Sequence, residues 1–230
     1  MKTRQIGFTL VEIAIVLVII GLLLGGILKG QEMITQAKIK NIVNDFNGIT
    51  AAMNSYQDRY RALPGDDLNA GTRWTNAGGV GTVYAGDGNG QFTAAGATEV
   101  YNNIPAAAAT AATPEVNKFW WHLRLAGFVS GSTLAASISS ITPPSNAVNG
   151  IMGVQTGGPA GFFTSNMICS SNLPDKIAGA VDTQMDDGTA ASGQVRANLQ
   201  AAPNPTLHAI VAGDAYVETG TAQYVLCKNL

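Results

Sequence analysis

The feature that most constrains the fold of this 230-residue chain is an apolar run close to its N-terminus. A short basic segment containing Lys2 and Arg4 comes first, and from Phe8 to Leu28 the only ionisable side chain is that of Glu12. These 21 residues would form a helix about 32 Å long, enough to cross the roughly 30 Å hydrocarbon core of a bilayer. The run therefore predicts a membrane-spanning helix.

The charges around the run predict its orientation. Because basic residues precede it, the positive-inside tendency places residues 1–7 in the cytoplasm and sends the bulk of the chain outward. A secretory signal peptide is the alternative, but the run exceeds the roughly 7–15 apolar residues of such a signal, and no small-x-small cleavage site closes it. The carboxylate of Glu12 is costly in an apolar helix unless a partner neutralises it. The sequence therefore favours a retained helix whose glutamate has a partner.

The segment GFTLVE, residues 7–12, resembles the cleavage and methylation site of a type IV prepilin or pseudopilin. The resemblance implies that a prepilin peptidase cuts after Gly7 and N-methylates the new amino terminus at Phe8. It also implies that Glu12 pairs with the Phe8 amine of a neighbouring subunit, so that two charges neutralise one another in an apolar filament core. The alternative for Glu12 is a carboxylate that only complements the positive end of its own helix dipole.

The resemblance also implies a fold, which is of the α+β class. A long N-terminal helix, transmembrane in its first half and amphipathic in its second, is expected to pack on a C-terminal antiparallel β-sheet head that carries one or two short helices. The expected domains are a leader at residues 1–7, a transmembrane or filament-core helix at 8–28, the amphipathic half of the same helix at 29–63, and a globular extracytoplasmic head at 64–230.

The function implied by the resemblance is that of a structural subunit of a type IV pilus-like filament, not that of an enzyme. The alternatives are a type II secretion pseudopilin and a minor pilin that acts as an adhesin or DNA-uptake module. The implied partners are other filament subunits, the prepilin peptidase, and an inner-membrane assembly platform with its ATPase. The chain would cross the inner membrane once, with its N-terminus in the cytoplasm, and would enter an extracellular or periplasmic filament after assembly.

A proline-free segment from Lys29 to Tyr60 continues the apolar run. Its apolar residues recur every three or four positions, at Ile39, Ile42, Val43, Phe46, Ile49, Met53, Tyr56 and Tyr60. This spacing predicts a helix with one face buried against the head. The segment Leu63–Gly65 contains a proline and a glycine, which are expected to end the helix.

Charge and motif composition exclude several functions. The chain has 13 basic and 15 acidic residues, and cleavage after Gly7 would leave 11 basic residues against 15 acidic ones. A general attraction to nucleic acid is therefore not supported, and DNA binding is expected only for a DNA-uptake pilin. His122 and His208 have no ligand-like spacing, and no serine lies in a nucleophile elbow, so no catalytic residue is predicted.

One segment of the loop-rich region that follows the long helix could bind calcium. Asp87, Asn89 and Gln91 place oxygen ligands at alternating positions, as a calcium loop begins. The next carboxylate, Glu99, falls one place beyond the position of a closing glutamate. The alternative is a series of Asx and glycine turns with nothing bound. No other cofactor is expected.

The rest of the head is expected to contain short elements. A helix is expected to start after Thr113, a candidate N-cap, and to stop at Gly127. Of its adjacent residues Trp120 and Trp121, one is expected in the core and the other against a loop or a neighbour, because adjacent helical positions point about 100° apart. Strands of an antiparallel sheet are predicted at Gly150–Val154, Gly161–Ile168, Leu207–Ala212 and Gln223–Cys227, with a helix at Leu173–Asp187.

Two further features of the C-terminal part could carry a role. Cys169 and Cys227 are the only cysteines, and such a pair in an exported domain predicts a disulfide, with two buried thiols as the alternative. Many pilins also close their C-terminal region with one disulfide. Asp182, Asp186 and Asp187 could chelate a cation or could simply form a solvated helix end.

Overall fold

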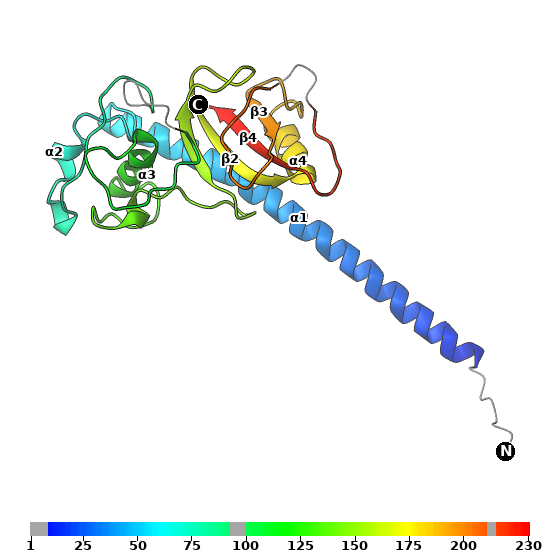
Figure 1. Ribbon diagram of the computed structural model, residues 1–230. Coiled ribbons are helices and arrows are strands. Elements are labelled where there is room, and N and C mark those ends of the chain that lie inside the picture. The colour runs from blue at the N-terminus through cyan, green and yellow to red at the C-terminus, as the bar shows by residue number, and fades with distance from the viewer. Residues whose placement is uncertain (1–8, 93–99, 211–214) are drawn as a thin grey trace. The chain divides into compact units, whose positions relative to one another are not determined.

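The computed structural model describes residues 9–92, 100–210 and 215–230 of the chain (Figure 1). The chain divides into two compact units, one that ends at Lys38 and one that begins at Ile39. One helix, α1 (Leu10–Tyr60), begins in the first unit and continues into the second. The prediction of one long N-terminal helix is therefore confirmed.

The first part of α1 is apolar and exposed. Every described side chain from Leu10 to Leu28 is exposed, with Leu10 at 87% and Leu22 at 75% of their full accessible area. By length and composition, this is the one helix among the described residues that could cross a membrane. An apolar surface of this extent requires lipid or another protein to cover it.

The second part of α1 buries one face in the head, as its periodicity predicts. The residues on that face are fully buried or nearly so: Ile39, Ile42, Phe46, Ile49, Ala52, Met53 and Tyr56. Val43 and Tyr60 are partly buried against the same core. This core also contains Val154, Ile168 and Leu226 from the sheet, so the helix packs on the inner face of the sheet.

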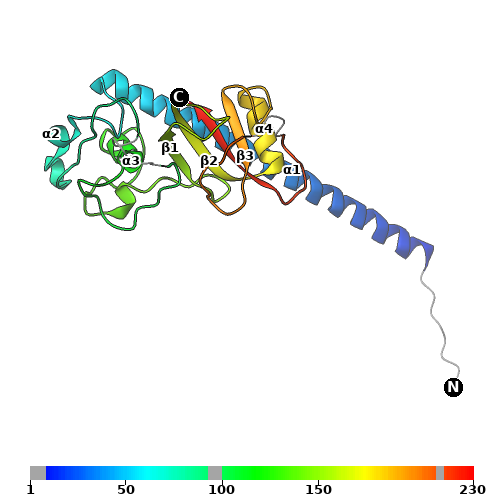
Figure 2. The same cartoon turned by 45° about the horizontal axis from the view of Figure 1, so that its top comes forward.

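The sheet has four antiparallel strands in the order β1-β2-β4-β3 (Figure 2). The strands are β1 (Met152–Thr156), β2 (Asn166–Pro174), β3 (Val195–Leu199) and β4 (Gln223–Asn229). Loops cover the outer face through a second apolar cluster that includes Phe162, Phe163 and Ile210. The α+β class and the antiparallel head are confirmed.

One strand was predicted in the wrong place. Within the described part of Leu207–Ala212 the chain forms no strand. The remaining strand of the sheet is β3, which comes earlier in the sequence. The sequence VRANL alternates apolar and polar residues, which is the pattern of a half-buried strand, so a local signal was present here and was missed. The polar side chains of Arg196 and Asn198 donate to backbone carbonyls, of Gly161 at 2.7 Å and of His208 at 2.6 Å. The segment around His208 is thus a loop that satisfies a strand residue.

Two predicted boundaries also need correction. The second strand begins at Asn166, because the chain turns between Pro159 and Phe162, whose backbone atoms form a hydrogen bond of 3.0 Å. The helix expected at Leu173–Asp187 is α4 (Asp175–Met185) and is shorter, because its first two expected residues complete β2.

The helix α3 (Glu115–Leu125) lies close to its predicted position. Thr113 does not cap it, because its hydroxyl oxygen accepts the Thr110 N–H at 2.8 Å, and the N-cap position is occupied by Pro114. Trp120 joins the main core, whereas Trp121 packs in a separate cluster with loop residues and donates its indole N–H to the Thr133 carbonyl at 2.9 Å. The different surroundings expected for the two tryptophans are confirmed.

The head also contains a short helix, α2 (Ala70–Trp74), and two 3-10 turns, η1 (Ala77–Gly79) and η2 (Ile138–Ser140).

Candidate functional site

The N-terminal site is described from Thr9 onward, because Gly7 and Phe8 lie outside the described residues. Glu12 lies in the first turn of α1 and is exposed. Its Oε2 atom accepts the Thr9 backbone N–H and the Thr9 hydroxyl, both at 2.8 Å, and the Glu12 N–H points to the Thr9 hydroxyl oxygen at 3.3 Å. This reciprocal arrangement is a capping box.

The capping box shows what Glu12 does in a single chain. Its carboxylate satisfies N–H and O–H donors at the start of its own helix, where a negative charge also complements the helix dipole. The carboxylate remains accessible to a cationic group of another chain, because it is exposed. The pairing with the Phe8 amine of a neighbour stays a prediction.

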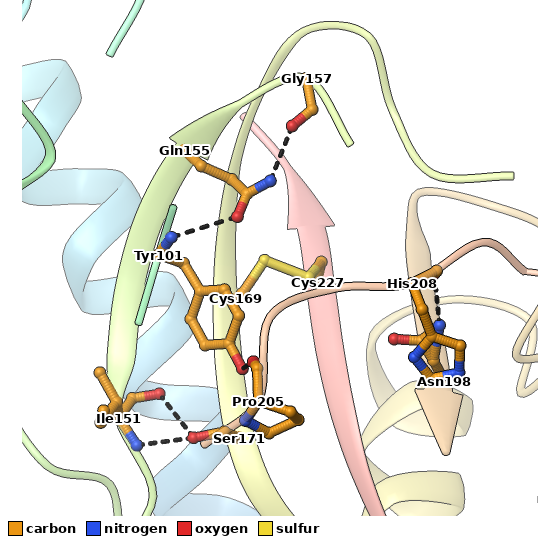
Figure 3. Close-up of a disulfide and its surroundings, with 10 residues drawn as sticks. All are labelled: Tyr101, Ile151, Gln155, Gly157, Cys169, Ser171, Asn198, Pro205, His208 and Cys227. Atoms are coloured by element: carbon orange, nitrogen blue, oxygen red, sulfur yellow. Dashed lines mark hydrogen bonds between the residues drawn. A yellow bond between two sulfur atoms is a disulfide. The ribbon is translucent and has the colours of Figure 1, made fainter. Parts of the chain in front are cut away.

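The two cysteines form a disulfide between the central strands of the sheet (Figure 3). Cys169 on β2 lies directly opposite Cys227 on β4, and both are fully buried. Tyr101 lies over the same face, where its backbone N–H donates to Gln155 at 3.1 Å and its hydroxyl donates to the Pro205 carbonyl at 2.6 Å. The disulfide is thus a fully buried structural link beneath a layer of loops.

The segment expected to bind calcium is folded by its own hydrogen bonds. Asp87 Oδ1 accepts the Asn89 N–H at 3.1 Å, and Asn89 Oδ1 accepts the Gln91 N–H at 2.7 Å. These are Asx turns, which the sequence analysis gave as the alternative. Glu99 lies outside the described residues, and calcium at this segment stays a prediction.

Sequence reasoning missed two acidic residues that the fold brings to Asp87. Asp66 and Glu115 each place a carboxylate oxygen within 4.8 Å of that of Asp87 and of one another. Glu115 accepts the Asp87 backbone N–H at 2.8 Å, and burial raises the pKa of Glu115 to about 7, with the charge of Asp87 acting in the same direction. Only the pairing of α3 with a distant loop creates this group, so no local pattern could have indicated it.

A second buried network, also missed, joins the end of α1 to α2. The Tyr56 hydroxyl donates to Asp67 Oδ2 at 2.7 Å, Arg73 forms an ion pair with the same carboxylate, and the Asn69 N–H donates to Oδ1 at 2.8 Å. Burial raises the pKa of Asp67, but its hydrogen bonds with Arg73 and Tyr56 outweigh burial, and the net shift is downward. The network is structural, because Asp67 is fully buried.

His122 fixes the turn that ends α1. It is fully buried, its Nδ1 atom accepts the Gly65 N–H at 2.9 Å, and its Nε2 atom lies 3.1 Å from the Tyr84 carbonyl oxygen. Burial lowers the pKa of His122 to about 4, so the ring is neutral at pH 7 and donates from Nε2. Its role is to hold three segments together.

The other acidic group proposed from the sequence does come together. Asp182, Asp186 and Asp187 each have a carboxylate oxygen within 4.8 Å of those of the other two.

Comparison with known proteins assigns only the N-terminal segment. A family model described as the prokaryotic N-terminal methylation motif matches residues 2–28. No curated protein and no solved structure matches the chain significantly. The matched residues include the expected cleavage point and the exposed apolar part of α1, and they leave the head unassigned. The chain thus carries at its N-terminus a prokaryotic methylation motif, which is consistent with a type IV prepilin or pseudopilin.

Proposed function

We propose that this chain is a structural subunit of a type IV pilus-like filament. It is made as a prepilin, cleaved after Gly7, methylated at Phe8 and polymerised through α1. The observation that carries the proposal is the coincidence of the methylation motif at residues 2–28 with a helix whose apolar side chains are exposed from Leu10 to Leu28. A processed N-terminus on an uncovered apolar helix is what a filament with a helical core requires.

The apolar half of α1 has two environments in this proposal. Before assembly it spans the inner membrane, where lipid covers its side chains. In the filament, the helices of neighbouring subunits cover one another, and close packing and dispersion hold them together. The transfer from lipid to filament has no hydrophobic driving force of the aqueous kind, so assembly is driven by a separate ATPase acting through the inner-membrane platform.

Glu12 sets the axial register of the helices. An unpaired carboxylate and an unpaired ammonium would each be heavily penalised in an apolar filament core, whereas a pair neutralises both. In the single chain, Thr9 occupies the Glu12 carboxylate through two hydrogen bonds. A neighbour's Phe8 amine competes for this carboxylate during assembly and adds a charge interaction that Thr9 does not provide.

The head is the variable part of the subunit. A pseudopilin of a type II secretion system and a minor pilin with an adhesive or DNA-binding tip would share the same N-terminal mechanism. The long stretch between α2 and α3 has little regular structure in its described residues, which favours a specialised surface on the filament exterior. In all three cases the chain is a component of a filament and not an enzyme, and in the third case its head also binds a surface or DNA.

Intact mass spectrometry of sheared cell-surface material and of membranes tests the proposal. The expected species is Phe8–Leu230 with one added methyl group and two hydrogens fewer, which corresponds to one disulfide. Abundance in the sheared fraction supports a pilus subunit, and confinement of the same mass to membranes supports a pseudopilin or a minor component. An uncut chain in both fractions would contradict the proposal.

A further inference from the structure

Asp182 is the buried member of an acidic group at the C-terminal end of α4. Its side chain is 0% exposed, whereas Asp186 and Asp187 lie in the exposed loop that follows the helix. One carboxylate oxygen from each residue lies within 4.8 Å of the others. Oxygens that share one calcium ion, each at about 2.3–2.6 Å, lie no more than about 5 Å apart. The spacing therefore fits a shared ion.

Two of the three carboxylates have an oxygen that accepts no hydrogen bond from a described residue, whereas Asp187 accepts the Thr189 N–H at 2.8 Å and the Ser192 hydroxyl at 2.6 Å, one on each oxygen. The Tyr216 hydroxyl donates to Asp182 Oδ2 at 2.6 Å, but the buried Oδ1 atom of Asp182 accepts no hydrogen bond from any residue that the structure describes. Asp186 Oδ2 accepts the N–H groups of Gln194 and Val195, and its Oδ1 atom has no donor within the same described ranges. A buried oxygen with no donor is costly, and a bound cation would offset that cost.

The charges of the three aspartates also favour a bound cation. Within residues 9–92, 100–210 and 215–230, no lysine or arginine forms an ion pair with any of the three aspartates. A divalent cation would remove the mutual repulsion of the three carboxylates.

We propose that Asp182, Asp186 and Asp187 bind a calcium ion. Carboxylate oxygens are the ligands of hard cations, and a loop that is partly exposed suits the six to eight ligands and flexible geometry of calcium better than the strict octahedron of magnesium. Water completes the coordination on the exposed side. The Tyr216 hydroxyl orients Asp182, as groups behind metal ligands commonly do.

Calcium at this position would join three segments of the head. Asp182 belongs to α4, Asp186 fixes the first residues of β3, and Tyr216 lies in the segment that precedes β4. Gly193 permits the approach of the loop, because a Cβ atom there would lie 1.8 Å from Asp186 Oδ2. The ion would therefore stabilise the end of the head that contains α4 and β3.

The test is a calcium titration of the full chain in zwitterionic detergent micelles after treatment with a chelator. We expect titration calorimetry to detect calcium binding. We also expect calcium to raise the thermal unfolding temperature more than magnesium does at the same concentration. Asp182→Asn keeps an oxygen acceptor for Tyr216 but removes the charge, and it should abolish the calcium response. Asp58→Asn, at an exposed position of α1, is the matched control and should keep the response.

Two further variants separate binding from folding. Asp186→Asn changes an exposed loop residue and should also abolish the response. Tyr216→Phe leaves every charge in place and should weaken calcium binding by about 10- to 100-fold, the usual effect of removing a group that orients a ligand. An unchanged unfolding temperature of the unsubstituted chain in calcium would overturn the proposal. Loss of the response in Asp87→Asn with its retention in Asp182→Asn would overturn it too, and would place calcium at residues 87–91.

Discussion

Glu12 accepts both the backbone N–H and the hydroxyl of Thr9 at 2.8 Å, so a single chain already holds the carboxylate that filament assembly is proposed to use. The capping box stabilises the start of α1 by satisfying donors at the first turn of the helix. A charged amine offers a stronger bond than these neutral donors. We therefore expect the exchange of partners on assembly to be favourable where the amine and the carboxylate meet in an apolar core.

The first prediction separates the charge of Glu12 from its hydrogen bonds. Glu12→Gln keeps a carbonyl oxygen for Thr9 but cannot neutralise an amine, so filaments should fall to background in sheared material while the head remains folded. Immunoblots of sheared and membrane fractions measure the loss, and near-ultraviolet circular dichroism checks the head. Normal filament yield from this variant would contradict the proposed pairing.

Gly7→Asp provides the corresponding test of processing. A bulky charged residue at the cleavage point should block the peptidase, so the membrane fraction should contain the uncut chain and the sheared fraction should contain none. Intact mass spectrometry reads both outcomes directly. A mature mass for this variant would show that Gly7 is not the residue at which the chain is cut.

Removal of the disulfide is expected to lower the stability of the head without changing its fold. Cys169 and Cys227 are 58 residues apart, and opening a loop of this size is expected to lower the free energy of unfolding by about 4 kcal/mol. The double variant Cys169→Ser with Cys227→Ser should show this loss in urea unfolding. The unsubstituted chain treated with a reductant is the control and should match the double variant within about 1 kcal/mol, the usual effect of a small buried substitution.

Local patterns predicted α1 well because its signals are local. The uninterrupted apolar run and the three-to-four spacing from Ile39 to Tyr56 are properties of the helix itself. The methylation motif is equally local, since all of its residues lie within one short segment. The α3 helix and the disulfide were also predictable, because a proline before an amphipathic run and an isolated cysteine pair each carry their own signal.

The rest of the head depends on contacts between distant segments. The polar residues of β3 are satisfied by loop carbonyls that no pattern places beside them. The hydrogen bond from Gly65 to His122 spans 57 positions, and that from Asp87 to Glu115 spans 28. Sequence reasoning could name His122 as an isolated histidine, but only the fold shows that it is a buried acceptor.

The buried state of His122 predicts a loss of stability in acid. Its folded pKa of about 4 lies below the ordinary value of 6.5, so the unfolded chain binds the extra proton first. Stability is therefore complete above about pH 6.5 and declines as the pH falls toward 4, by about 3 kcal/mol from this residue. His122→Gln should be less stable at pH 7 but should lack this part of the acid dependence in urea unfolding at a series of pH values.

The raised pKa of Glu115 predicts the opposite pH dependence of stability, over a pH range that overlaps with that of His122. Its folded pKa of about 7 lies above the ordinary 4.5, so its contribution is complete below pH 4.5 and is lost as the pH rises through 7. Glu115→Gln keeps an acceptor for the Asp87 N–H and does not titrate. The stability of the unsubstituted chain relative to this variant should fall between pH 4.5 and 7. A constant difference across that range would show that the carboxyl group is ionised throughout.

The hydroxyl of Tyr56 supports the buried carboxylate of Asp67 and can be removed without changing the ring. Tyr56→Phe takes away one donor from a fully buried anion that also binds Arg73, and a loss of about 1–3 kcal/mol is expected because the carboxylate oxygen is then less well satisfied. Tyr60→Phe is the matched control, since Tyr60 contributes a ring to the same aromatic group. Urea unfolding at pH 7 measures both. Equal stabilities of the two variants would mean that Arg73 and the Asn69 N–H alone are enough to stabilise the Asp67 carboxylate.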